Sequence, residues 1–147
     1  MLPKHHTIIN LIIALILLLF INPLYVLIIF LSSVLIDVDH YLYYVFEKKR
    51  FSLKSAYNWF LIERKRFFEL SLEERKKHRY FILIFHGLET LVIILLLSRY
   101  FPLLFFIFIG FSIHLIEDSI EAIKFKFAKR RLILSYAIYL HIKNKVK

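Results

Sequence analysis

Residues 7–36 read TIINLIIALILLLFINPLYVLIIFLSSVLI, a run of 30 residues without a charged side chain. As one straight helix this run would be about 45 Å long, whereas the hydrocarbon core of a bilayer is about 30 Å thick. Asn22-Pro23 lies at its midpoint, and proline disfavours a continuous helix. The run therefore predicts either one long, kinked span or a hairpin of two short helices over residues 6–21 and 24–38.

The same apolar pattern returns later in the chain. Two further apolar blocks, residues 80–97 and 103–121, are separated by Ser98-Arg99-Tyr100-Phe101-Pro102, which is typical of a turn with aromatic residues at a membrane interface. Hydrophobic residues make up 60% of the 147-residue chain, well above the roughly 45–50% of soluble domains. We therefore expect an all-α, multi-pass membrane protein, a single domain over residues 1–147 with about four transmembrane helices in two hairpins.

Positive charge is distributed unequally along this chain of net charge +10. Of the 21 lysines and arginines, only Arg99 lies in the two hairpin loops, and the others lie at Lys4 and within residues 48–79 and 124–147. Basic residues accumulate on the cytoplasmic side of membrane proteins. The distribution predicts a protein of the cell (inner, cytoplasmic) membrane with both termini in the cytoplasm.

The polar segments also have expected structures. Residues 41–79 mix aromatic with basic side chains, as in an interfacial helix that lies on anionic lipid headgroups. Ser71-x-x-Glu74 predicts a capping box that starts a helix running through Arg79 into the third span, and residues 124–147 predict a basic C-terminal helix. The chain has no cysteine, which excludes disulfide scaffolds and thiolate metal sites, and no motif indicates nucleic-acid binding.

Ionisable side chains inside apolar helices are expensive, at about 2.5–3.5 kcal/mol each even on insertion scales. Such side chains form four clusters in this chain, and the hairpin interpretation is favoured because it brings all four clusters to one depth below the cytoplasmic surface. Pairs spaced i,i+3 or i,i+4 should share one helix face, as expected for His86 with Glu89 and for His114 with Asp118. The four clusters are His5-His6, Asp37-Val38-Asp39-His40, His86 with Glu89, and His114 with Glu117 and Asp118.

Neutral imidazole and carboxylate are ligands that suit zinc, manganese or iron, and helix bundles build metal sites from such inward-facing side chains. Simpler roles are also open, such as interfacial histidines, a cytosolic helix cap at Asp37–His40, or neutralisation of a lysine by Glu117. The expected ligands of a divalent ion, zinc first, are His6 (or His5), Asp37, Asp39, His40, His86, His114 and Asp118. The candidate bases, or residues that orient a ligand, are Asp39, Glu89 and Glu117.

The four clusters, in their order along the chain, resemble the sequence motifs of the YdjM-like, LexA-regulated family of inner-membrane metal-dependent hydrolases. His6 (or His5) stands where that family has its early histidine, and Asp37-Val38-Asp39-His40 is similar to its Pro-Asp-x-Asp-His motif without the proline. Gly110-Phe-Ser-Ile-His114-Leu-Ile-Glu-Asp118 matches its Gly-x-x-x-His-x-x-x-Asp motif, whereas Phe85-His86-Gly87-Leu88-Glu89 replaces its His-Arg-Gly-x-Thr-His motif. The resemblance, over residues 5–120, implies a membrane-bound, metal-dependent hydrolase, with zinc as the expected metal.

The expected reaction is hydrolysis of a phosphoester or similar bond in a lipid-like substrate at the cytoplasmic face, because the clusters lie beside a basic segment suited to anionic headgroups. A non-enzymatic cation or proton carrier is the alternative, since buried Asp, Glu and His also relay ions, and a structural membrane protein is a third. A conduit would need polar residues along its whole length. Residues 8–21 and 90–97 offer only Asn10 and Thr90, which disfavours a conduit.

Overall fold

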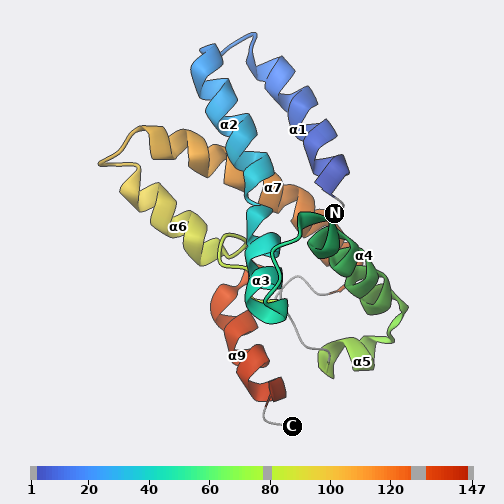
Figure 1. The fold of residues 1–147 in the computed structure, drawn as a ribbon. Coiled ribbons are helices and arrows are strands. Elements are labelled where there is room, and N and C mark those ends of the chain that lie inside the picture. The colour runs from blue at the N-terminus through green and yellow to red at the C-terminus, as the bar shows by residue number, and fades with distance from the viewer. Residues whose placement is uncertain (1–2, 78–80, 127–131, 146–147) are drawn as a thin grey trace.

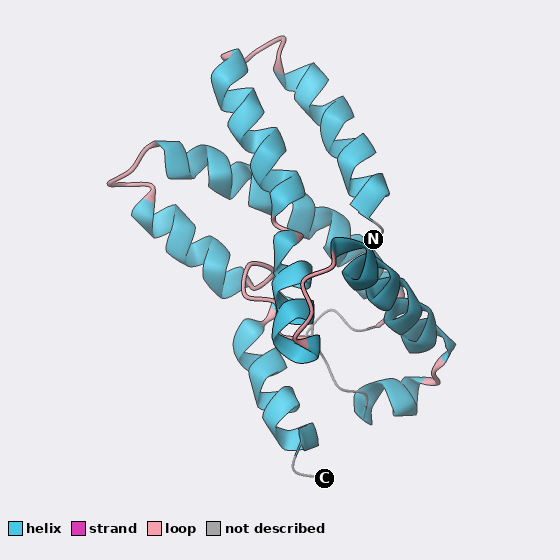
Figure 2. Ribbon diagram, viewed as in Figure 1, coloured by secondary structure: helices cyan, strands magenta, loops and turns pink. Residues whose placement is uncertain are grey.

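The computed structural model of the chain describes residues 3–77, 81–126 and 132–145, and the regular structure in these ranges is all helical (Figures 1 and 2). The prediction of an all-α protein is thus confirmed. In chain order the helices are α1 (Pro3–Leu17), α2 (Pro23–Leu35), α3 (Val38–Lys48), α4 (Leu53–Glu69), α5 (Leu72–Lys77), α6 (Leu88–Leu97), α7 (Leu103–Lys124) and α9 (Leu134–Lys145).

The long apolar run folds as a hairpin of α1 and α2, as Figure 1 shows. Pro23 is the first residue of α2, where its missing N–H is not needed. The Asn22 side-chain oxygen accepts the N–H of Leu24 at 2.9 Å and so caps the helix. The turn predicted at Asn22-Pro23 is confirmed. A second hairpin joins α6 to α7 through the loop that contains Arg99.

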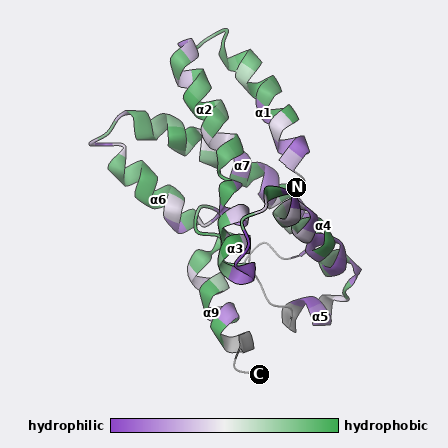
Figure 3. Ribbon diagram, viewed as in Figure 1, coloured by the Kyte–Doolittle hydropathy of each residue, from purple (hydrophilic) through white to green (hydrophobic). Residues whose placement is uncertain are grey.

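Two helical segments are long and apolar enough to cross a bilayer, Pro23–Lys48 and Leu103–Lys124. The helices α1 and α6 are apolar but shorter, and the ten residues of α6 rise only about 15 Å, half of a hydrocarbon core. The hairpins are predominantly hydrophobic, whereas hydrophilic residues gather on α4 and at the C-terminal end of α3 (Figure 3). These features support membrane association, and the four-span topology stays a prediction.

The third predicted span differs from the structure. Residues 81–87 are not helical, and α6 begins only at Leu88. The Asp39 carboxylate accepts the N–H of Phe85 at 2.6 Å, and Gly87 precedes the helix in an extended conformation with φ −89° and ψ 142°. The backbone around residue 85 thus bonds to a distant carboxylate rather than to a helical turn.

Two predictions are therefore wrong. Within residues 80–97, of which residue 80 lies outside the described ranges, only Leu88–Leu97 forms a helix. His86 and Glu89 do not share a helix face, because His86 lies in the loop before α6. The physical reason is a tertiary contact with Asp39, which local apolar periodicity cannot reveal.

Helix α7 packs directly on α2 at Gly110. A Cβ atom at this position would lie 2.0 Å from Ser32 Oγ and 2.4 Å from the carbonyl oxygen of Ile29. Only glycine allows the two backbones to approach this closely. Gly110 shares one face of α7 with His114 and Asp118, at i, i+4 and i+8, so the close approach also brings α2 against the polar cluster.

The polar segment after α3 folds back on the protein. Ser71 and Glu74 form the predicted capping box, with the Glu74 N–H donating to Ser71 Oγ at 3.3 Å and the Ser71 N–H donating to the Glu74 carboxylate at 2.8 Å. Trp59 of α4 packs against Tyr44 and Phe81, with ring centroids 5.7 and 5.5 Å apart. Part of the aromatic face expected on headgroups thus packs against the protein instead.

The ends of two predicted segments cannot be compared with the structure. The continuation of the helix after α5, through residues 78–80, lies outside the described residues. The predicted basic tail, residues 124–147, contains α9, whereas residues 127–131 and 146–147 also lie outside them.

Candidate metal centre

Four histidines and four carboxylates from separate elements meet at the polar end of the hairpins. They come from the first turn of α1, the break between α2 and α3, the first turn of α3, the loop before α6 and the second half of α7. The His86 and His114 side chains are completely buried, and His6 and Asp118 are each 2% exposed. The group consists of His6, Asp37, Asp39, His40, His86, His114, Glu117 and Asp118.

Two imidazole nitrogens and two carboxylate oxygens form the centre of this group. Asp37 Oδ1 lies 3.4 Å from His86 Nε2 and 3.6 Å from His114 Nε2. Asp118 Oδ2 lies 3.6 Å from His86 Nε2 and 3.5 Å from His114 Nε2. These distances exceed those of normal hydrogen bonds. They match the separation of about 3.4 Å between two ligand atoms that each lie about 2.1 Å from one tetrahedral ion.

The His114 ring is held in the tautomer that a metal requires. Its Nδ1 lies 2.8 Å from the carbonyl oxygen of Ser33, and a carbonyl can only accept, so Nδ1 carries the proton. The Nε2 lone pair of the neutral ring is then directed at the two carboxylates. Nε2 is buried and has no hydrogen-bond partner in the part of the chain that the structure describes. A lone pair in this position is available to a metal ion.

His86 is oriented in a similar way by Asp39. Its Nδ1 lies 3.3 Å from Asp39 Oδ2, the same oxygen that accepts the Phe85 N–H. Its Nε2 is also buried without a hydrogen-bond partner among the described residues. A carboxylate behind a ligating histidine fixes the ring and raises its basicity. The geometry therefore gives Asp39 an orienting role, whereas Asp37 and Asp118 face the Nε2 atoms.

His40 completes the group on the side of α4. Its Nε2 lies 3.6 Å from Asp37 Oδ1, the oxygen that His86 and His114 also face. The His40 ring contacts the edge of His86 at 5.1 Å and that of Phe60 at 4.8 Å between centroids. Phe60 of α4 thus covers this side of the cluster, and His40 can serve as a further ligand.

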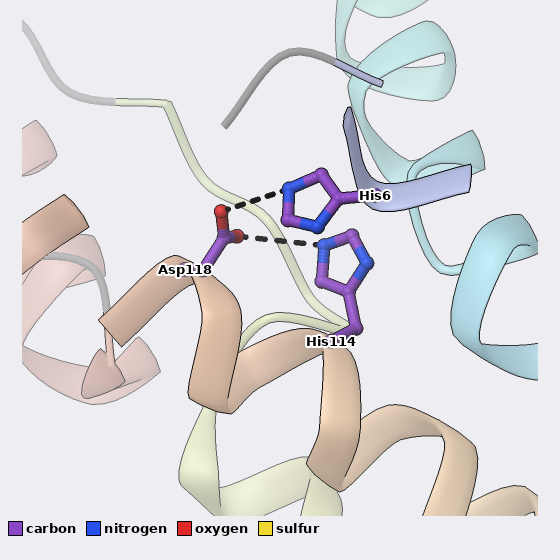
Figure 4. A group of neighbouring side chains, drawn as sticks. All are labelled: His6, His114 and Asp118. Carbon is purple, nitrogen blue, oxygen red and sulfur yellow. Dashed lines mark ion pairs between the residues drawn. The ribbon is translucent and has the colours of Figure 1, made fainter. Parts of the chain in front are cut away.

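His6, rather than His5, belongs to the site. His5 is exposed, whereas His6 is buried, with Nδ1 on the Glu117 carboxylate and Nε2 3.3 Å from Asp118 Oδ1. Figure 4 shows the rings of His6 and His114 one above the other, both beside Asp118. The sequence analysis left open whether His5 or His6 is the ligand, and burial now identifies His6. Two adjacent histidines in a sequence do not indicate which of them is buried.

The structure does not bring Glu89 to the cluster. Its carboxylate accepts the N–H groups of Leu134 and Ser135, both at 2.9 Å, and the Ser135 hydroxyl at 2.9 Å. Glu89 thus satisfies the free N–H groups at the start of α9. Backbone hydrogen bonds from Ser135 and Leu134 are also the contacts that attach α9 to α6. We therefore assign Glu89 a structural role.

This assignment makes a prediction about α9. Glu89→Ala removes the acceptor for two N–H groups at the start of α9, a loss worth about 1 kcal/mol. Since about 1.4 kcal/mol corresponds to a factor of ten, amide exchange in α9 should accelerate about fivefold. Hydrogen exchange of the purified protein measures this, with Glu63→Ala, which removes a half-buried carboxylate of α4 paired with Arg66, as the control. Metal binding should not change. Unaltered exchange in α9, or loss of the metal, would contradict the assignment.

The Ser33 carbonyl and Asn10 are two features of the site that the sequence analysis missed. A backbone carbonyl gives no sequence signal, and Gly110 is the only hint that α2 comes close to α7. Asn10 is 2% exposed, and neither its Oδ1 nor its Nδ2 has a hydrogen-bond partner among the described residues. It lies one turn after His6 on the buried face of α1, and its i,i+4 spacing from His6 was the available signal.

Comparisons with known proteins give no match: no family model, no curated protein and no solved structure is similar to this chain. The resemblance to the YdjM-like family therefore stays a prediction. The chemistry of the site has to be inferred from its own geometry.

Proposed function

We propose that the protein is a membrane-bound, metal-dependent hydrolase related to the YdjM-like family. The observation that carries the proposal is the set of two buried Nε2 lone pairs and two carboxylate oxygens at the spacing of a metal polyhedron. Asp37, His86, His114 and Asp118 would hold the ion, with His40 beside them. This mixture of nitrogen and oxygen donors suits zinc, and also manganese or iron.

A divalent ion held there would lower the pKa of a bound water and polarise a phosphoryl oxygen. Of the three carboxylates expected as bases, Asp39 orients His86 and Glu89 caps α9. Glu117 differs, because its Oε2 contacts His6 whereas its Oε1 is buried without a hydrogen-bond partner among the described residues. We therefore assign Glu117 as the proton acceptor for the attacking water.

The position of the site supports a phosphate-bearing, lipid-like substrate. The apolar outer faces of the hairpins are strongly exposed, with Leu15 of α1 at 57% and Leu96 of α6 at 66%, as expected for surfaces in contact with acyl chains. On α3, Lys48 follows His40 by two turns and Lys49 ends the helix, which places positive charge about 12 Å from the cluster. Anionic headgroups would thus be held next to the ligands at the cytoplasmic face.

The distribution of polar groups favours an enzyme over an ion carrier. In the described structure, the buried ionisable side chains lie in the cluster, and none lies in residues 11–31 or 90–109, toward the hairpin tips. Carriers need ionisable groups along their path. We therefore expect no ion flux in vesicles that contain the purified protein. Flux that is lost with the His86→Ala variant would establish the carrier instead.

Hydrolysis itself is tested with the protein in nanodiscs that contain phosphatidic acid, by measuring phosphate release with added Zn²⁺ or Mn²⁺. Release should stop with a chelator and fall at least about 100-fold in His86→Ala, because a ligand position contributes several kcal/mol of charge stabilisation. His141→Ala, on α9 and outside the cluster, is the matched control and should keep full activity. A folded protein that retains no metal, or activity that survives chelation, would refute the proposal.

A further inference from the structure

The two oxygens of Asp118 face different histidines. Oδ2 is the atom near His86 and His114, at 3.6 and 3.5 Å. Oδ1 instead faces His6 Nε2, at 3.3 Å. Figure 4 shows this division, with one oxygen directed at His6 and the other at His114. A carboxylate that presents each oxygen to a separate donor group is in the arrangement of a bridging ligand.

One nitrogen of His6, one nitrogen of His114 and one oxygen of Asp118 lie within 4.8 Å of one another, but the ring planes of the two histidines favour separate ions. Their rings are stacked, with centroids 4.1 Å apart and an interplanar angle of 21°. An ion bound to an imidazole lies near the ring plane, about 2.1 Å from the nitrogen, and two planes so nearly parallel do not meet within that reach. In contrast, the rings of His86 and His114 are inclined by 82°, with centroids 5.2 Å apart, an arrangement in which both rings can face one ion.

His6 nevertheless has the features of a metal ligand. Its Nδ1 contacts the buried Glu117 carboxylate, the arrangement that fixes the tautomer and orientation of ligating histidines. Its Nε2 is thereby directed at Asp118 Oδ1. His6 lies in the first turns of an apolar helix, where an ionisable group without a function would be costly.

We propose that His6 Nε2 and Asp118 Oδ1 bind a second divalent ion, bridged by Asp118 to the first. This inference rests on the proposed function, because the first ion is the one held by Asp37, His86 and His114. The centroids of the two stacked rings are 4.1 Å apart, which is close to the spacing of about 3.5–4 Å between the ions of two-metal hydrolases. The second ion, with fewer protein ligands among the described residues, binds more weakly than the first.

Manganese titration of the purified protein tests the second site. Equilibrium dialysis followed by elemental analysis should give two Mn²⁺ per chain in two affinity classes, and electron paramagnetic resonance should show a spin-coupled pair. His6→Ala should lose the weaker class and leave the spectrum of an isolated Mn²⁺. His5→Ala is the matched control on the adjacent, exposed position and should behave as the unaltered protein.

The outcomes separate the second site from the proposed function. One Mn²⁺ per chain in both the unaltered protein and His6→Ala would overturn the second site and leave the first intact. No Mn²⁺ in a folded protein would overturn both. Helix content by circular dichroism and size in detergent establish folding, and His6→Gln, which keeps a polar group beside Glu117, replaces His6→Ala if the alanine variant does not fold. Loss of spin coupling in His6→Gln would support the second site, and a retained coupled pair would overturn it.

Discussion

Asp118→Asn should weaken binding of the first ion at least about 100-fold and eliminate binding of the second. Each carboxylate oxygen faces a different set of imidazoles, so a neutral amide removes the charge from both sites at once. Even the residues behind metal ligands change affinity by about 10–100-fold, and a shared ligand should exceed that range. Competition of Zn²⁺ with a chromophoric chelator measures the loss.

Asp39→Asn is the control for this prediction, and we expect it to lose less metal affinity than Asp118→Asn. Asp39 orients His86 without facing its Nε2, so its amide variant should lose about 10–100-fold in affinity for the first ion and retain two ions per chain. If Asp118→Asn bound both ions as tightly as the unaltered protein, Asp118 would not be a ligand. If Asp39→Asn were more damaging than Asp118→Asn, the assigned roles would be reversed.

Gly110→Leu should destabilise the protein by about 3 kcal/mol or more, the upper part of the range for overpacked interiors. Any Cβ here would meet Ser32 Oγ at 2.0 Å and the Ile29 carbonyl at 2.4 Å. The helices α2 and α7 would have to separate, which would also withdraw the Ser33 carbonyl from His114. Unfolding in mixed detergent micelles, followed by circular dichroism, measures the loss.

The control for this substitution is Ile116→Phe, which also adds volume on α7. Ile116 is 61% exposed, so a larger side chain there should change stability by less than about 0.5 kcal/mol. Weaker zinc binding in Gly110→Leu, measured under conditions where the protein is folded, would confirm that the helix contact positions His114. A Gly110→Leu variant as stable as the unaltered protein would refute the close approach of α2 and α7.

The parts of the fold that depend on nearby residues could be predicted from the sequence. Asn22-Pro23 ends one helix and starts the next, and Ser71 with Glu74 starts another, because each uses bonds within three residues. The non-helical loop at residues 81–87 could not be predicted, because it depends on Asp39, which is 46 residues away from Phe85. For the same reason the sequence places Glu89 in the site, because its partners Leu134 and Ser135 lie 45 and 46 positions later.

The site follows the same rule. His114 and Asp118 share one helix face by their spacing, and the structure places them 3.5 Å apart, as expected. The roles of the two carboxylates in Asp37-Val38-Asp39 depend on which one meets His86 Nδ1, and that is decided by packing of the loop before α6. The assignment of His6 and His114 to different ions depends on the orientation of their ring planes, about which a sequence carries no information.

An anomalous difference map at the zinc absorption edge, from crystals of the protein loaded with Zn²⁺, tests the metal centre most directly. We predict a peak between Asp37, His86, His114 and Asp118, about 2.0–2.2 Å from the two Nε2 atoms and from one oxygen of each carboxylate. A map in which these side chains are ordered without a peak, while zinc occupies only exposed sites such as His5, would contradict the metal centre and the function built on it.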